Sequence, residues 1–126
     1  MGTSIFHGTG LTPDQYLKEM NRFEVAFSKM QNREYEEAIT GFLKVCESNK
    51  IHTQSYGNLG LCHAYLGRKQ EALSAFNRAL EIDPDYEPAD INREIFLNLR
   101  DGEEMPHVTK TIEYYRELSR LLEDSR

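Results

Sequence analysis

The chain resembles itself at an offset of 34 residues, and this internal repeat limits its possible folds more than any other feature. At this offset Ala38 aligns with Ala72 and Phe42 aligns with Phe76, and each segment is preceded by another stretch with helical periodicity. Repeats of this length are typical of architectures in which short helical units stack and bury their apolar faces against one another. The repeat therefore predicts a stack of helix pairs.

The second unit carries the fuller pattern, an aromatic-x2-Leu-Gly segment followed by Gly, Ala-x3-Phe-x2-Ala and Pro. The residues of this pattern are Tyr56, Leu59, Gly60, Gly67, Ala72, Phe76, Ala79 and Pro84. Over residues 53–86 the pattern resembles the tetratricopeptide repeat family. Residues 19–52 match it well in their second helix and less well before it, where Arg33 replaces the turn glycine. A third unit begins at residue 87 but is degenerate, because Pro106 falls inside its expected second helix and would break that helix.

The resemblance implies an all-α fold, a right-handed stack of antiparallel helix pairs forming an α-solenoid. It would contain two full repeats, a degenerate third and a C-terminal capping helix. We expect helices at about 13–31, 34–48, 53–66, 69–82, 87–100 and 107–123. Residues 1–11 are expected to be irregular, residues 12–123 to form a single domain, and residues 124–126 to be a tail.

Local signals support these bounds. Thr12, Pro13 and Gln15 are typical of a helix start. The last helix has an apolar stripe at Val108, Ile112, Tyr115, Leu118 and Leu122. It is expected to cap the stack, and the alternative is that it leaves the body and pairs with a second copy.

Gly57 and Gly60 lie inside an expected helix, where glycine costs about 1 kcal/mol relative to alanine. The resemblance implies that Gly60 allows close helix packing together with Ala72. Gly57 is not required by the family pattern. We therefore expect it to open space for a ligand.

The resemblance also implies a concave groove lined by the first helix of each unit. The candidate groove residues are Phe23, Phe27, Gly57, Asn58, Leu61, Tyr65, Ile91, Asn92 and Ile95. Such a mostly apolar groove suits an extended peptide or a helix. The two asparagines are candidate donors to a peptide backbone, or alternatively solvated polar positions. The groove is either open to a partner, or covered by residues 4–11, by the last helix or by a second copy.

Some members of this family bind the C-terminal carboxylate of chaperones through a clamp of basic and amide side chains. Of the corresponding positions here, only Asn58 matches. Phe23 and Phe27 replace a lysine and an asparagine, and Pro88 and Asn92 replace two basic residues. Because the cationic donors are missing, we expect no chaperone-tail binding of this kind.

Charge and hydropathy limit the partners. The formal net charge is −6, which argues against nucleic acid, because binding to nucleic acid relies on cationic side chains. No apolar run approaches the roughly 20 residues that span a bilayer, so no membrane partner is expected. These features are typical of a cytoplasmic protein.

The sequence has no residue pattern for catalysis or for a metal. Cys46 and Cys62 are expected to be buried, free thiols, and His63 to be packed and hydrogen-bonded. We therefore expect no enzyme activity, no catalytic residues, no metal and no cofactor. The predicted function is a protein–protein interaction module, an adaptor or scaffold. The alternative is a structural module that self-associates as a homodimer.

Overall fold

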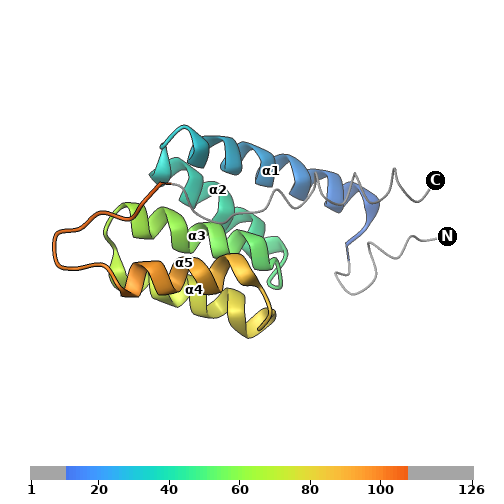
Figure 1. Cartoon of the computed structure of the whole chain (residues 1–126). Helices are drawn as coiled ribbons and strands as arrows, with labels where there is room; N and C mark the ends of the chain where they lie inside the picture. Colours follow the sequence, from blue (N-terminus) through green and yellow to red (C-terminus); the bar gives the residue numbers. More distant parts are fainter. Residues whose placement is uncertain (1–10, 108–126) are drawn as a thin grey trace, which may run out of the picture.

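This computed structural model describes residues 11–107, which contain five α-helices joined by short links (Figure 1). The helices are α1 (Pro13–Gln31), α2 (Tyr35–Ser48), α3 (Thr53–Tyr65), α4 (Lys69–Ile82) and α5 (Glu87–Leu97). The all-α prediction is confirmed, and no strand occurs among these residues. The expected segment before residue 11 and the expected helix at 107–123 lie outside the described residues, apart from His107.

The start of α1 follows from its sequence. The Thr12 hydroxyl accepts a hydrogen bond from the Gln15 backbone N–H (3.2 Å), and the Gln15 side-chain oxygen accepts one from the Thr12 N–H (3.0 Å). This capping box satisfies two N–H groups that have no partner inside the helix. Pro13 occupies the first turn, where no N–H is needed.

The first helix of each full unit ends in the same backbone geometry. After α3, the N–H groups of Gly67 and Arg68 bond to the carbonyls of Ala64 (3.0 Å) and His63 (2.9 Å). After α1, the N–H groups of Arg33 and Glu34 make the equivalent bonds, 3.0 and 2.9 Å long. This is the Schellman arrangement, which needs a residue with positive φ. Gly67 supplies it at 73°, whereas in the first unit Arg33 adopts 63°.

Substitution of Arg33 by glycine is therefore expected to raise the free energy of unfolding by about 0.5–1 kcal/mol. The left-handed conformation costs a residue with a Cβ about 1–2 kcal/mol, and the added freedom of glycine in the unfolded chain offsets part of that gain. Urea denaturation measures the difference. The matched control is Arg22→Gly, at an exposed position inside α1, which should lower stability by about 1 kcal/mol. A loss of stability at both positions would contradict the backbone argument.

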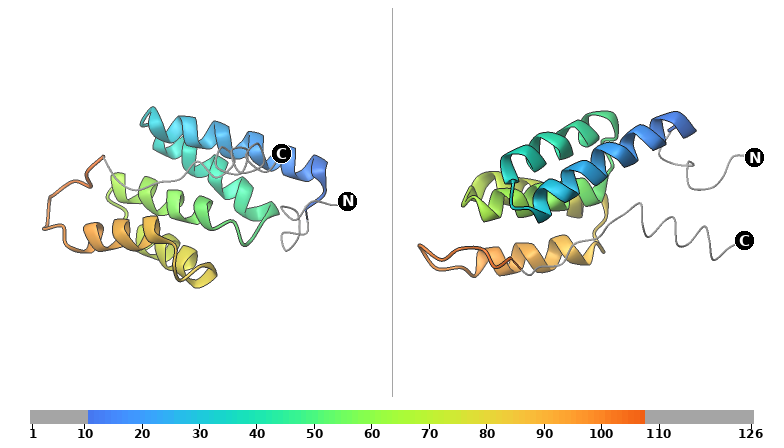
Figure 2. Two further views of the ribbon diagram at one scale, coloured as in Figure 1. Left: turned by 45° about the vertical axis from the view of Figure 1, so that its right-hand side comes forward. Right: turned by 90° about the horizontal axis from the view of Figure 1, so that it is seen from above.

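Helix α3 is the centre of the stack. It contacts α1, α2, α4 and α5, and the left view of Figure 2 shows α1 and α2 on one side of it and α4 and α5 on the other. Nine of its thirteen residues are buried. A helix surrounded in this way has no solvent-facing polar stripe, which is why α3 is apolar or small on nearly every side.

The close approach of paired helices depends on missing side chains. In the first unit, a Cβ on Gly41 would lie 2.7 Å from the Cβ of Ala26. In the second unit, a Cβ on Gly60 would lie 2.5 Å from the Phe76 ring. The packing role of Gly60 thus fits the sequence, but the side chain nearest to it is Phe76 rather than Ala72. The aromatic ring fills the space that the absent Cβ leaves.

Helix α5 begins where the third unit was expected but ends at Leu97, before the expected Arg100. A separate turn takes over the backbone there, because the Arg100 N–H bonds to the Glu103 carboxylate (2.8 Å) and Gly102 has a φ of 85°. Residues 98–107, here called the strap, leave α5 and return to the turn between α1 and α2 (Figure 1). Met105 is buried, so the strap is packed against the core.

Candidate functional site

A pocket of about 360 Å³ lies where the end of α1, the α1–α2 turn, α3 and the strap meet. We call it the tyrosine pocket. Its lining residues are Phe27, Met30, Gln31, Arg33, Tyr35, Leu61, Tyr65 and His107. Phe27 and Leu61 are buried, whereas the two tyrosines are half-buried and His107 is exposed. The pocket thus combines an apolar floor with polar groups at its rim, as is usual for binding sites.

Three stacked rings form one wall of the tyrosine pocket. The Tyr35 and Tyr65 rings are 4.7 Å apart, and the Tyr65 and His107 rings are 5.1 Å apart. The Tyr35 hydroxyl is hydrogen-bonded to His107 Nδ1 (3.0 Å), and the Tyr65 hydroxyl donates to the His107 carbonyl (3.1 Å). Burial, and secondarily Tyr65, raises the pKa of Tyr35, which favours its neutral hydroxyl.

Three of the nine predicted groove residues, Phe27, Leu61 and Tyr65, line this pocket together. Phe23 does not, because it is fully buried and its ring packs edge-on against Phe42 at 5.6 Å. Phe23 is therefore a core residue that joins α1 to α2. The predicted role of Phe23 as an anchor in the groove is not supported, because its side chain is not exposed to a ligand.

Gly57 is also explained by packing within the chain. A Cβ at this position would lie 2.9 Å from Cε2 of Tyr86, which follows α4 and is itself buried. The space above Gly57 is thus filled by Tyr86. The expectation that packing does not require this glycine was wrong, because the contact comes from the link between α4 and α5.

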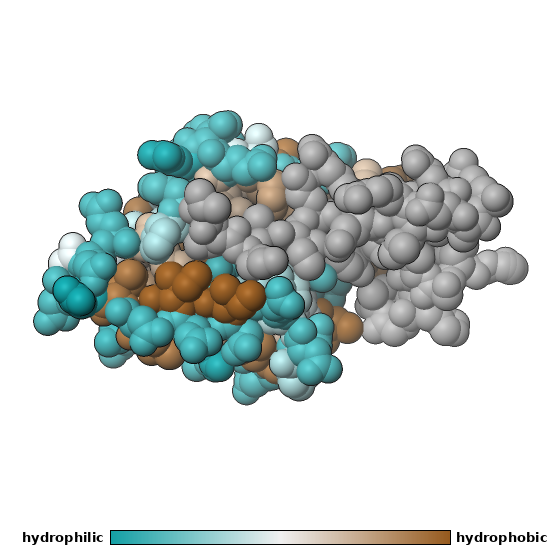
Figure 3. Space-filling view, in the orientation of Figure 1, coloured by the Kyte–Doolittle hydropathy of each residue, from teal (hydrophilic) through white to brown (hydrophobic). Residues whose placement is uncertain are grey.

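The two asparagines occupy equivalent positions in successive units, and both are 1% exposed. Their burial fits neither a solvated position on a helix face nor a donor exposed to a peptide in the groove. On α5, Ile91 and Ile95 are half-buried and do not line the tyrosine pocket. Figure 3 shows apolar side chains gathered over α5 on the face turned toward the viewer.

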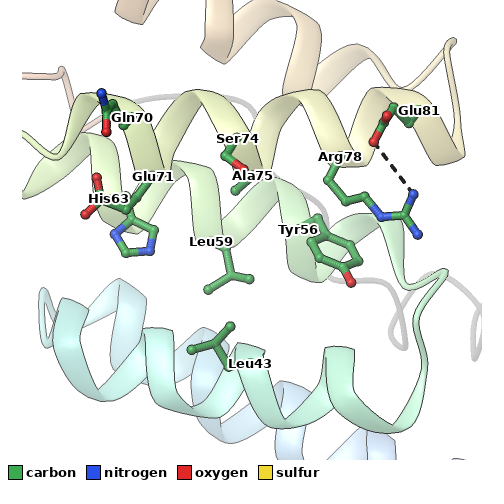
Figure 4. A pocket seen from close by; sticks show the side chains of 10 residues that line it. All are labelled: Leu43, Tyr56, Leu59, His63, Gln70, Glu71, Ser74, Ala75, Arg78 and Glu81. Atoms are coloured by element: carbon green, nitrogen blue, oxygen red, sulfur yellow. Dashed lines mark ion pairs between the residues drawn. The ribbon is translucent and has the colours of Figure 1, made fainter.

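A second, larger hollow of about 610 Å³ lies on the other side of α3, between α2 and α4 (Figure 4). Leu43 from α2 and Tyr56, Leu59 and His63 from α3 line it, together with residues of α4. The Arg78 guanidinium lies over the Tyr56 ring at 5.7 Å. The repeat pattern did not predict this hollow, because the pattern indicated only a groove lined by first helices, whereas this hollow also involves the second helices α2 and α4.

His63 departs from its expected role. It is half-buried, burial lowers its pKa, and its Nδ1 has no hydrogen-bond partner among residues 11–107. The expected packing is present, and the expected hydrogen bond is not made at this nitrogen.

A buried polar cluster connects α1, α2 and α3. Glu19 Oε1 lies 3.1 Å from His52 Nε2, and Asn49 Nδ2 donates to both Glu19 oxygens at 3.2 and 3.3 Å. His52 Nδ1 accepts the Ser55 N–H (3.2 Å) and so caps α3. All three side chains are at least 94% buried. Sequence reasoning missed this cluster, although a glutamate close to the apolar stripe of α1 was a signal for it.

Among residues 11–107, the candidates for metal binding or nucleophilic chemistry are the acidic, histidine and cysteine side chains. No group of three or more His, Cys, Asp or Glu side chains within residues 11–107 could hold a metal ion. Cys46 and Cys62 are buried and free, as predicted, and burial raises the pKa of each thiol to about 12. Such thiols are poor nucleophiles near neutral pH. Among these residues, no helix combines the length and hydropathy needed to cross a membrane.

Comparison with known families agrees with the repeat pattern, since the tetratricopeptide repeat model matches residues 53–86. Residues 53–86 thus match one tetratricopeptide repeat. The matched residues cover α3, α4 and the link to α5. No curated protein and no solved structure gave a significant match. Tetratricopeptide repeats generally mediate protein–protein interaction.

Proposed function

We propose that this protein is a non-catalytic adaptor of the tetratricopeptide repeat type that binds a peptide or helix at the tyrosine pocket. The observation that carries the proposal is the convergence of Phe27, Leu61 and Tyr65 on one hollow. These residues come from two successive units, so a ligand there would contact both at once. Binding across a repeat boundary is the usual advantage of a stacked array.

The chemistry of the pocket favours a ligand with one apolar or aromatic anchor. Its buried floor offers Phe27 and Leu61, and the Tyr35 and Tyr65 rings offer flat walls for stacking. Buried aromatic contacts contribute about 0.5–1.5 kcal/mol beyond the area they bury. Gln31 and Arg33 are exposed at the rim, where they would meet polar groups of the ligand.

Replacing Tyr65 with alanine tests this proposal. Random peptides displayed on phage are selected on the wild-type chain, and the affinity of a synthetic selected peptide is measured by fluorescence anisotropy. We expect Tyr65→Ala to weaken binding by about 2 kcal/mol, roughly thirtyfold, as for a central aromatic hot spot.

Tyr56 provides a matched control, since it is also a half-buried tyrosine of α3 but lines the hollow between α2 and α4. Tyr56→Ala should leave the affinity within about twofold, because it makes no contact in the tyrosine pocket. Equal losses in both variants would point to a general effect on the fold. Light scattering on the same samples tests the alternative function as a homodimer. A wild-type dimer that dissociates in the Tyr65→Ala variant would support that alternative.

A further inference from the structure

The last residue of the strap, His107, forms part of the wall of the tyrosine pocket. His107 is separated by 72 residues from Tyr35 and by 42 from Tyr65, yet it is hydrogen-bonded to both. Its ring also stacks on theirs. Successive Cα atoms are about 3.8 Å apart, so the chain continues directly from the Cα atom of His107. The rest of the chain thus starts at the mouth of the proposed binding site.

The sequence after His107 has the apolar periodicity of a helix that could bind in such a site. The apolar stripe from Val108 through Ile112 and Tyr115 to Leu118 repeats every three or four residues. An amphipathic helix with this spacing is one of the recurring ligands of apolar grooves. A helix over residues 108–123 would be about 24 Å long at 1.5 Å per residue. That length is comparable to α1, so the segment could extend along the face beside the pocket.

We propose that residues 108–126 bind intramolecularly on the face that carries the tyrosine pocket and compete there with a peptide partner. The anchored position of His107 supports this occupant over a second copy or a foreign segment. A ligand tethered with no spacer has an effective concentration of about a millimolar. Even a weak intrinsic affinity would then keep the segment bound. The inference rests on the proposed function and adds its regulation.

The test uses the full chain with charges changed on or off the stripe. Ile112→Glu combined with Leu118→Glu should disrupt docking of the segment, whereas Lys110→Gln combined with Arg120→Gln makes the same change of net charge on the opposite face of the expected helix. We expect the on-stripe variant to bind the selected peptide about tenfold more tightly than the wild type, because the tethered competitor is removed. The off-stripe control should bind it like the wild type. Circular dichroism checks the fold, and Leu118→Ala replaces the on-stripe variant if that variant unfolds.

A labelled synthetic peptide of residues 108–126 gives a second measurement that needs no foreign ligand. It should bind the on-stripe variant in trans, bind the wild type at least tenfold more weakly, and lose affinity when Tyr65→Ala is added. If this peptide binds neither protein and the stripe does not affect the selected peptide, the inference is wrong and the proposed function stands. If only the 108–126 peptide binds, the inference stands and the function in partner binding falls. A wild-type dimer that the on-stripe variant dissociates would assign the segment to a second copy and overturn the intramolecular proposal.

Discussion

Replacing His52 with alanine is expected to lower the free energy of unfolding by about 3 kcal/mol. Two interactions would be lost together. A hydrogen bond to a charged group contributes about 1.5–3 kcal/mol, and a side-chain N-cap about 1 kcal/mol. The histidine ring also lies 5.3 Å from the Phe23 ring, so the variant would leave a cavity beside the core.

The hydrogen bonds of His52 indicate which tautomer of the neutral ring is present. Because Nδ1 accepts the Ser55 N–H, the proton of the neutral ring is on Nε2, which faces Glu19 Oε1. His52 therefore donates to a buried carboxylate while it caps α3. Asn49 supports the same carboxylate from the end of α2. The cluster fixes the start of the second unit against the first.

A double-mutant cycle measures the pair directly. His52→Ala and Glu19→Ala should each destabilise the fold in urea denaturation, and the double variant should lose about 1.5–3 kcal/mol less than the sum. His63→Ala is the control, because His63 is half-buried and its Nδ1 makes no hydrogen bond to the described residues. It should cost about 1 kcal/mol or less. A coupling energy near zero would mean that the contact contributes nothing to stability.

Local signals in the sequence were enough to place the helices. Thr12, Gly67 and the repeat offset marked helix ends that the structure reproduces within one residue for α1 to α4. The same offset aligned Arg33 with a turn glycine, and the backbone there does adopt a positive φ. Capping and turns depend on neighbours in the sequence, so a pattern read along the chain can find them.

The candidate site was only partly predictable. Leu61 and Tyr65 line the pocket because they follow the repeat, as does Phe27 one unit earlier. Tyr86 and His107 were not foreseen as contacts, since the first lies in a link and the second at the end of the strap. Such contacts between irregular segments have no periodicity. The missing repeat at Pro106 showed where the pattern stops, but not where the chain goes next.

The roles of Gly57 and Gly60 in α3 were likewise only partly predictable from the sequence. Gly60 belongs to the family pattern, and its packing role could be predicted from that resemblance. Gly57 was interpreted as a gap for a ligand because nothing near it in the sequence required a small residue. In the structure both positions are covered by an aromatic side chain of the same chain, so burial by a distant residue decided the matter.

Substitution of Gly60 by alanine is expected to lower the free energy of unfolding by about 2 kcal/mol, although alanine is the better helix former by about 1 kcal/mol. The new Cβ would lie 2.5 and 2.6 Å from two atoms of the Phe76 ring, whereas carbon atoms prefer separations of about 3.5–4.0 Å. Phe76 is fully buried, and close packing of a protein interior limits how far its ring can shift.

The reversal of helix preference separates packing from propensity. At Ser74, an exposed position of α4, the alanine variant should be about 1 kcal/mol more stable than the glycine variant. At position 60 the order should be inverted. The inversion should weaken in a Phe76→Leu background, because a smaller and more flexible side chain can make room for the new Cβ. If alanine is favoured at both positions by the same amount, the ring does not constrain Gly60 and the packing argument fails.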